Sequence, residues 1–115
     1  MSLKIYHNPR CSKSRQALAI LTEGGADFDI VEYLKTGLTI SELEDLATRS
    51  GGDVRAMMRT GEAVYKDLHL KNESDDAALI KAMVENPILL ERPLVTDTKM
   101  AIICRPPELA KKFLG

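Results

Sequence analysis

The sequence has no long apolar run and almost no net charge, and both absences narrow the class of protein. Its 115 residues include 16 Lys and Arg against 17 Asp and Glu, so nothing draws the whole chain toward nucleic acid or anionic membranes. The apolar stretches fall far short of the roughly 20 residues that cross a bilayer, and Met1-Ser2-Leu3-Lys4 lacks a signal-peptide core. With no heptad pattern either, we expect a monomeric cytoplasmic protein of one domain, residues 1–115, that binds neither membrane nor nucleic acid.

Cysteine is scarce, and its spacing excludes several kinds of site. Cys11 and Cys104 are too few and too far apart for a disulfide framework, so both should be thiols in the cytosol. A dithiol redox motif would need cysteine where Ser14 stands, and a phosphatase-type loop would need arginine where Ala17 stands. The ligand pairs of a zinc site and the glycine patterns that bind nucleotides are also absent from the sequence, so we expect no metal.

Acidic residues are missing from the segment around Cys11. The first carboxylate is Glu23, and before it stand four basic residues, Lys4, Arg10, Lys13 and Arg15. A helix is expected to begin just after Cys11, and its unpaired N–H groups would favour the thiolate together with these cations. His7 would add a donor or a positive charge. This pattern predicts a nucleophilic cysteine in a small anion site, although a solvated basic face around an inert buried cysteine would give the same composition.

The apolar periodicity predicts an α/β fold. Strand, helix and strand in the first 33 residues form a βαβ unit whose strands should be parallel, and a hairpin turning at Asp97-Thr98 follows a helical middle. Strands are expected at 3–6, 28–33, 94–95 and 100–103, and helices at 12–23, after Thr39, after Asp53, from Ser74 to Asn86 and from Pro106 to Phe113.

Local signals mark several of these helix ends. Thr39 and Glu42 fit a capping box, and Gly51-Gly52 should stop the helix that it opens. Ser74 is expected to begin a later helix. In the short helix after Asp53, Arg55 and Arg59 are four residues apart and should share one face, with Val54, Met57 and Met58 inward.

Three arginines stand at junctions where functional side chains often lie. Arg59 ends the short helix, Arg92 precedes Pro93, and Arg105 follows the last expected strand. Arginine presents a planar fork of donors that suits a tetrahedral oxyanion.

Together these residues carry a resemblance to a known family. The segment from His7 to Arg15, His-Asn-Pro-Arg-Cys-Ser-Lys-Ser-Arg, resembles the active-site segment of the glutaredoxin-linked arsenate reductases of the ArsC type. Residues 54–59, residues 86–93 and Cys104-Arg105-Pro106 resemble that family's other blocks, in the same order. The resemblance covers essentially the whole chain and is to a shorter subgroup. It implies a thioredoxin-like fold with a helical insertion at about 39–86, between the βαβ and ββα units.

The resemblance also implies roles for individual residues. Cys11 would be the nucleophile that attacks arsenate, with His7 and Ser14 stabilising its thiolate. The expected substrate-binding residues are Arg59, Arg92, Arg105 and, from its place near the cysteine, Arg15. Pro93 matches a proline that is cis in thioredoxin-like folds, and Cys104 matches no catalytic position.

The implied reaction reduces arsenate to arsenite without a metal or a bound cofactor. Cys11 forms an adduct with arsenate, glutathione adds to the arsenic as co-substrate, and glutaredoxin removes the glutathione. Two alternatives remain open. One is a glutathione-linked reductase or transferase for another substrate. The other is a regulatory module like the Spx proteins, which bind RNA polymerase, although those generally use a Cys-x-x-Cys pair and this chain has Ser14.

Overall fold

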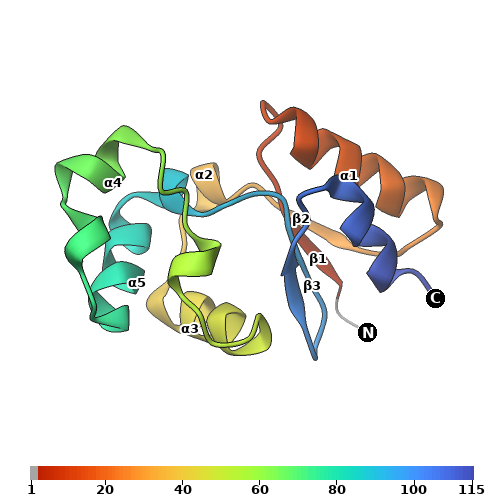
Figure 1. Cartoon of the computed structure of the whole chain (residues 1–115). Helices are drawn as coiled ribbons and strands as arrows, with labels where there is room; N and C mark the ends of the chain where they lie inside the picture. The colour runs from red at the N-terminus through yellow and green to blue at the C-terminus, as the bar shows by residue number, and fades with distance from the viewer. Residues whose placement is uncertain (1–2) are drawn as a thin grey trace. The chain divides into compact units, whose positions relative to one another are not determined.

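The computed structural model describes residues 3–115 and divides them into two compact units (Figure 1). The sheet unit comprises residues 3–36 and 92–115, and the helical unit is Gly37–Glu91. Met1 and Ser2, which begin the segment examined for a signal peptide, lie outside the described residues. None of the helices in the described part of the chain has the length and hydrophobicity needed to cross a membrane.

The sheet unit is built on four short strands in the order β2-β1-β3-β4. β1 runs parallel to β2 and antiparallel to β3, so Ile5 lies opposite both Ile30 and Val95, and β3 forms an antiparallel hairpin with β4. These pairings confirm the expected βαβ unit and hairpin. The strands are β1 (Lys4–Tyr6), β2 (Asp29–Val31), β3 (Leu94–Thr96) and β4 (Ala101–Ile103).

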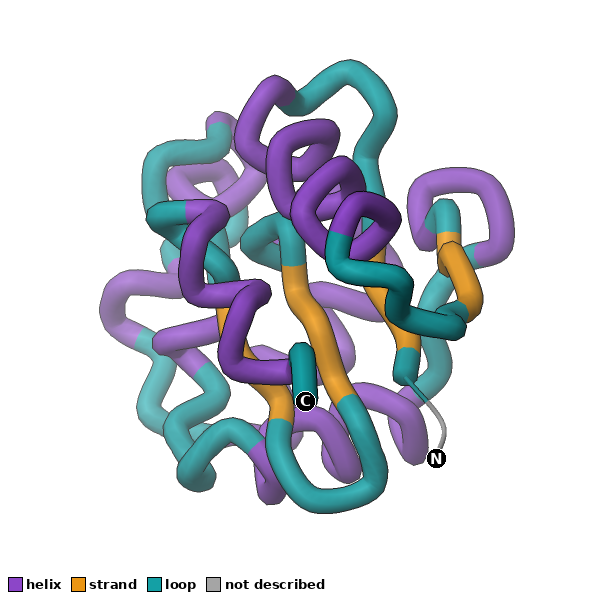
Figure 2. The backbone as a smooth tube through the Cα atoms, turned by 90° about the vertical axis from the view of Figure 1, so that its right-hand side faces the viewer, coloured by secondary structure: helices purple, strands orange, loops and turns teal. Residues whose placement is uncertain are grey.

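Two helices cover one face of this sheet and pack against each other (Figure 2). They are α1 (Ser12–Glu23) and the C-terminal 3₁₀ helix η4 (Pro107–Phe113). A short helix, α2 (Tyr33–Thr36), follows β2. The core between helices and sheet consists of Leu3, Ile5, Ala17, Leu21, Val95, Cys104, Ala110 and Phe113.

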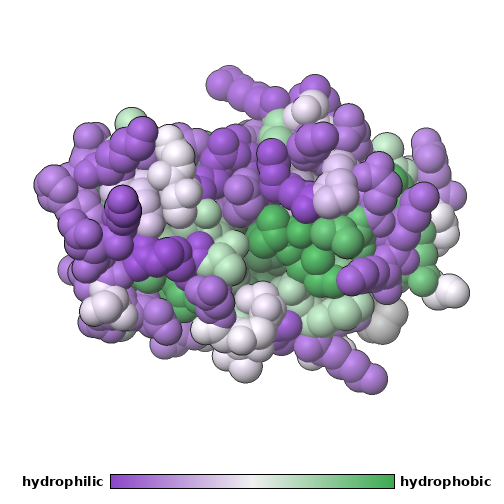
Figure 3. All heavy atoms as spheres, in the orientation of Figure 1, coloured by the Kyte–Doolittle hydropathy of each residue, from purple (hydrophilic) through white to green (hydrophobic). Residues whose placement is uncertain are grey.

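Hydrophobic side chains also reach the surface of the sheet unit. Figure 3 shows them gathered where β4 and η4 lie, with hydrophilic residues around them. Ile102 of β4 and Leu109 of η4 are partly buried residues that pack against the core. Most of the exposed surface in this view is hydrophilic, as the charge content of the sequence requires.

The helical unit is the insertion between β2 and β3. Its longer helices α3 and α5 pack on each other, and α5 also contacts η3. Buried leucine and methionine side chains, including Leu43, Leu46, Met57, Leu79 and Met83, fill its interior. Its elements are α3 (Ile40–Arg49), η1 (Arg55–Met57), α4 (Ala63–Asp67), η2 (Leu70–Asn72), α5 (Asp76–Glu85) and η3 (Pro87–Leu89).

The predicted ends of α3 are confirmed. The Glu42 N–H donates to Thr39 Oγ1 at 3.1 Å, and the Thr39 N–H donates to Glu42 Oε1 at 3.2 Å, which completes the capping box. At the other end Gly51 and Gly52 have φ of 110° and 89°, and the Gly52 N–H donates to the Ala47 carbonyl. Glycine adopts this left-handed backbone without the strain that a Cβ would bring.

Two local predictions in the helical unit are wrong. Helix α5 is capped by Asp75 and not by Ser74, because the Asp75 carboxylate accepts from the Ala77 N–H at 3.1 Å. The short helix η1 ends at Met57, so Arg55 and Arg59 do not share a helix face. Tight 3₁₀ turns break the four-residue periodicity on which that prediction rested.

Arg55 instead bridges parts of the helical unit. Its guanidinium donates to the Tyr65 hydroxyl and to the carbonyls of Leu70 and Glu73. Helix α4 and the 3₁₀ helix η2, which these contacts join to η1, were not expected from the sequence.

Candidate active site

The loop between β1 and α1 is held in place by Asn8. Its backbone N–H donates to Ser14 Oγ at 3.1 Å, its carbonyl accepts from the Cys11 N–H at 3.0 Å, and its side-chain oxygen accepts from the Arg10 N–H at 3.0 Å. Asn8 is buried, although it is polar. No role of its own was predicted for Asn8 from the sequence. A carboxamide just before a reactive cysteine was the available signal, since asparagine bonds its own backbone two residues on.

Arg15 also holds this loop from the first turns of α1. Its Nη1 donates to the Pro9 carbonyl at 2.9 Å. The sequence placed Arg15 among the substrate-binding residues. In the structure its guanidinium ties the loop to the helix, and its charge disfavours protonation of His7.

Cys11 is the N-cap residue of α1. Its backbone is extended, with φ −91° and ψ 122°, and the first turn after it contains no acidic residue. Partial burial raises the pKa of the Cys11 thiol, but hydrogen bonding from the Ser14 N–H, from the Arg92 side chain and from the Lys13 N–H outweighs burial and leaves the pKa below its ordinary value. The thiolate is therefore favoured by the unpaired amides of a helix start and by a guanidinium.

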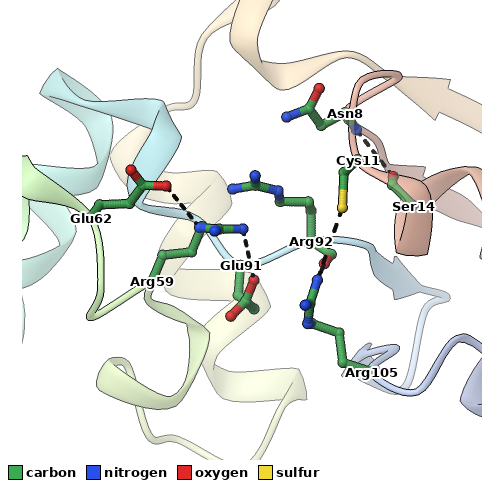
Figure 4. Close-up of polar contacts among 8 residues, drawn as sticks. All are labelled: Asn8, Cys11, Ser14, Arg59, Glu62, Glu91, Arg92 and Arg105. Carbon is green, nitrogen blue, oxygen red and sulfur yellow. Dashed lines mark hydrogen bonds and ion pairs between the residues drawn. The ribbon is translucent and has the colours of Figure 1, made fainter.

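The β3–β4 hairpin brings two arginines to this sulfur (Figure 4). Arg105 Nη1 lies 3.9 Å from Cys11 Sγ and donates to the Arg92 carbonyl at 3.0 Å. The register explains the meeting, because Leu94 pairs with Ile103 and the arginines flank that pair along the chain. The structure thus groups Cys11, Arg92 and Arg105, which lie far apart in sequence.

The backbone around Arg92 and Arg105 has an unusual geometry at both positions. The Arg92–Pro93 peptide bond is cis, the geometry that the resemblance implies for Pro93. The Arg105–Pro106 bond is cis as well, and this was not expected. The Cys104 N–H donates to the Pro93 carbonyl at 2.8 Å, so the two prolines belong to neighbouring parts of the hairpin base.

His7 contacts Ser14 through its ring. His7 Nδ1 and Ser14 Oγ are 2.6 Å apart, and both side chains are buried. Burial lowers the pKa of His7, nearby Glu32 partly opposes this, and Arg15 adds to the lowering. A neutral imidazole is therefore favoured over the positive charge that the sequence allowed. His7 and Ser14, with Asn8, link the end of β1 to the first turn of α1.

Arg59 belongs to the helical unit. Its Nε lies 3.0 Å from Glu62 Oε1, and its Nη1 lies 3.4 Å from Glu91 Oε1 (Figure 4). Its backbone N–H donates to the Leu89 carbonyl at 2.7 Å, next to the bridge between Met58 and Leu90. Two carboxylates thus orient this guanidinium within its own unit.

Cys104 differs from Cys11 in every respect that controls thiol reactivity. It is fully buried in the core, and its Sγ lies 3.6 Å from the Ile102 carbonyl. Burial raises the pKa of Cys104 to about 11. It is therefore protonated at neutral pH, and it forms no disulfide with Cys11.

The described residues offer no cluster for a metal ion. Nowhere in residues 3–115 do three or more His, Cys, Asp or Glu side chains come together in an arrangement that would hold one.

The fold and the site define a class of protein. A thioredoxin-like α/β unit presents one activated cysteine at the start of its first helix, with two arginines from the base of a hairpin beside the sulfur. The family model of the ArsC family matches residues 6–113, and the chain belongs to this family. The predicted fold class is confirmed by the same comparisons.

The similarity to individual relatives extends over nearly the whole chain. The chain is 46% identical to the uncharacterized protein YfgD of Escherichia coli K12 over 115 residues, which are 98% of this chain and 97% of that protein. It is 45% identical over 116 residues to the arsenate reductase of Haemophilus influenzae, covering 99% and 100% of the two chains. The solved arsenate reductase of Vibrio cholerae superposes with a TM-score of 0.94 at 45% identity, over 99% of this chain and 98% of that one.

Proposed function

We propose that the protein is an arsenate reductase that takes its electrons from glutathione and glutaredoxin. The observation that carries the proposal is the placement of the Cys11 sulfur, with a lowered pKa, 3.9 Å from the Arg105 guanidinium at the start of α1. Relatives that carry the name arsenate reductase support arsenate as the substrate. The presence of one activated cysteine supports external thiols as the reductant, since Cys11 has no neighbouring thiol to resolve it.

In the first step the Cys11 thiolate attacks arsenic. Amides of a helix start and guanidinium forks both bind tetrahedral oxyanions, and Cys11 has both beside it. The sulfur–arsenic bond forms, and one arsenate hydroxyl takes a proton and leaves as water. Arsenic remains As(V). Arg92 and Arg105 offset the negative charge of the incoming anion and of the transition state.

The next two steps move the electrons. Glutathione forms a second sulfur–arsenic bond, and a second hydroxyl leaves as water. The glutaredoxin thiolate then attacks the glutathione sulfur, the bond between that sulfur and arsenic breaks, and its electron pair reduces As(V) to As(III). Glutathione and glutaredoxin leave joined as a mixed disulfide. Water finally hydrolyses the Cys11–arsenic bond, which releases arsenite and regenerates the cysteine.

The remaining residues have supporting parts in this proposal. His7, Ser14 and Asn8 fix the loop from which Cys11 attacks. Arg59, oriented by Glu62 and Glu91, is proposed as a third arginine for the oxyanion. The reaction needs no metal and no bound cofactor, and we assign it to a monomer in the cytoplasm, where glutathione and glutaredoxin are reduced.

The test is a coupled assay with arsenate, glutathione, glutaredoxin, glutathione reductase and NADPH. We expect NADPH oxidation that depends on arsenate and is abolished by Cys11→Ser, while Cys104→Ala, which removes the buried thiol, keeps the activity. Arg92→Ala and Arg105→Ala should each lower kcat/KM for arsenate about 10- to 100-fold, the value of a hydrogen bond to a charged group. Lys111→Ala on the exposed side of η4 is the matched loss of a positive charge and should change little.

Two results would contradict the proposal. One is the absence of arsenate-dependent turnover with a glutaredoxin that is active in a separate assay. The other is equal loss of activity in Lys111→Ala and in the arginine variants. That result would show that Arg92 and Arg105 contribute only positive surface charge and do not bind the oxyanion.

A further inference from the structure

A cavity of about 270 Å³ opens in the sheet unit beside the Cys11 loop. Residues 7–10 of the loop form one wall, and Glu32, Leu34 and Lys35, which follow β2, form the other. The volume is just below the roughly 300–1,000 Å³ typical of ligand sites. The cavity therefore suits a small, extended molecule.

The walls of this cavity combine charge with apolar surface. Arg10 and Lys35 contribute two positive charges, and Glu32 contributes one negative charge. Pro9 and Leu34 are apolar, and Leu34 is 43% exposed although it is a large hydrophobic residue. Lys35 Nζ and Glu32 Oε1 are 3.5 Å apart in an exposed ion pair. Such a pair contributes little to stability, so a ligand can replace it without much loss.

The loop wall of the cavity is rigid and adjoins the reactive residue. The Asn8 side chain fixes the Arg10 N–H, and the Asn8 backbone holds both Cys11 and Ser14. Arg10 directly precedes Cys11, so their Cα atoms are only about 3.8 Å apart. A ligand on Arg10 thus binds one residue from the nucleophile.

We infer that this cavity binds glutathione, the co-substrate of the proposed function on which this inference rests. At neutral pH the tripeptide carries two carboxylates and one ammonium group, and the cavity offers two cations and one carboxylate. Pro9 and Leu34 provide apolar surface for the methylene groups between those charges. Three extended residues span about 10 Å, which is long enough for the thiol of a tripeptide anchored in the cavity to extend past Arg10 toward an arsenic atom on Cys11.

The charge pattern also accounts for selectivity among thiols. A thiol without both carboxylates makes one ionic contact fewer with Arg10 or Lys35, and one without the ammonium group makes none with Glu32. Cysteine and simple mercaptans should therefore be poorer co-substrates than glutathione. The bond that forms and the water that leaves are those of the second step above.

The binding experiment uses S-methylglutathione, whose blocked sulfur reacts with neither Cys11 nor arsenic. Titrating it into the ¹⁵N-labelled full chain should shift the amide resonances of Arg10, Glu32, Leu34 and Lys35. Lys35→Glu should raise its dissociation constant about five- to tenfold, as expected for the loss and reversal of one ionic contact. Lys111→Glu makes the same charge change on η4 and should leave the constant within twofold. Shifts that map elsewhere, or equal weakening in both variants, overturn the assignment.

The kinetic experiment separates this inference from the proposed function. In the coupled assay Lys35→Glu should raise KM for glutathione five- to tenfold and leave KM for arsenate unchanged, whereas an unchanged KM for glutathione counts against the cavity. If arsenate turnover is absent but S-methylglutathione shifts the cavity amides, the proposed function fails and the peptide-thiol site stands. If arsenate is turned over and those amides do not respond, the cavity assignment fails and the proposed function stands.

Discussion

The two cysteines show how strongly the surroundings of a thiol decide its chemistry. Cys11 and Cys104 have the same side chain, yet the first has a pKa below its ordinary value and the second a pKa raised to about 11. The difference arises because Cys11 stands at a helix start beside a guanidinium, whereas Cys104 is enclosed by apolar side chains. Only Cys11 is suited to nucleophilic attack at neutral pH.

The first prediction concerns the ionisation of Cys11. Alkylation by iodoacetamide, followed against pH in the Cys104→Ala protein, should have its midpoint below the free-cysteine value of about 8.5 because only the thiolate reacts. Arg92→Ala should move the midpoint upward, since it removes one of the groups that lower the pKa. Arg10→Ala, an equal charge loss next in sequence to Cys11, should move it less. A midpoint at or above 8.5 in the parent protein would contradict the assignment.

The roles of single residues could be predicted from the sequence where they depend on neighbours along the chain. The basic segment and the helix start after Cys11 were visible in the sequence, because they involve neighbours along the chain. The three hydrogen bonds of Asn8 and the tie from Arg15 to Pro9 were not, because they depend on how the loop folds back. The protonation of His7 also depends on burial, which the sequence does not display.

At the scale of elements, caps and turns are the features that the sequence determines best. The capping box of Thr39 is formed as predicted, since both of its partners lie within one turn. The short 3₁₀ helices η1, η2 and η3 were harder to predict from the sequence. They depend on long-range contacts, such as those of Arg55, and not on apolar periodicity. The start of α5 was missed by one residue because Ser74 and Asp75 are both good capping residues.

The second prediction tests the capping box. Thr39→Ala should lower the free energy of unfolding by about 1 kcal/mol, because the first turn of α3 loses the hydroxyl that accepts the Glu42 N–H. Thr48→Ala is the matched control, since that exposed hydroxyl only bonds back to the Glu44 carbonyl within the same helix and alanine is the better helix former. Urea denaturation measures both. Equal destabilisation by the two variants would show that the capping hydrogen bond does not contribute to the free energy of unfolding.

At the scale of the molecule, the sequence predicted the fold class and the order of the strands along the chain. The parallel β1–β2 pair follows from the strand–helix–strand pattern, and the β3–β4 hairpin follows from two strands joined by a short turn. The pairing of β1 with β3 places Ile5 opposite Val95, ninety positions apart in the printed sequence. No local pattern indicates such a contact. The grouping of Arg92 and Arg105 around Cys11 is another result of this long-range pairing.

The third prediction concerns the stability of the whole protein at alkaline pH. The folded state holds the Cys104 proton up to a pKa of about 11, whereas the unfolded chain releases it near 8.5, so the unfolded state binds fewer protons in this window. Stability should therefore fall as pH rises from about 8.5 to 11, with a Cys104 contribution of about 2 kcal/mol by pH 10.5. Urea unfolding at pH 8 and pH 10.5 measures the loss. In Cys104→Ala the difference between the two pH values should shrink by that amount, and an unchanged difference would contradict the prediction.

The register of the β3–β4 hairpin sets the position of Arg105, the arginine that follows it. Leu94 is paired with Ile103, and Arg105 reaches the sulfur because it stands at a fixed count beyond that pair. A register slip of one residue would carry the chain about 3.3 Å along the strand and turn alternate side chains to the opposite face. The Asp97 carboxylate accepts from the Lys99 and Met100 N–H groups and so fixes the turn at 97–100. A change in the length of this turn must be absorbed as a bulge within the turn itself if the guanidinium is to stay beside the nucleophile.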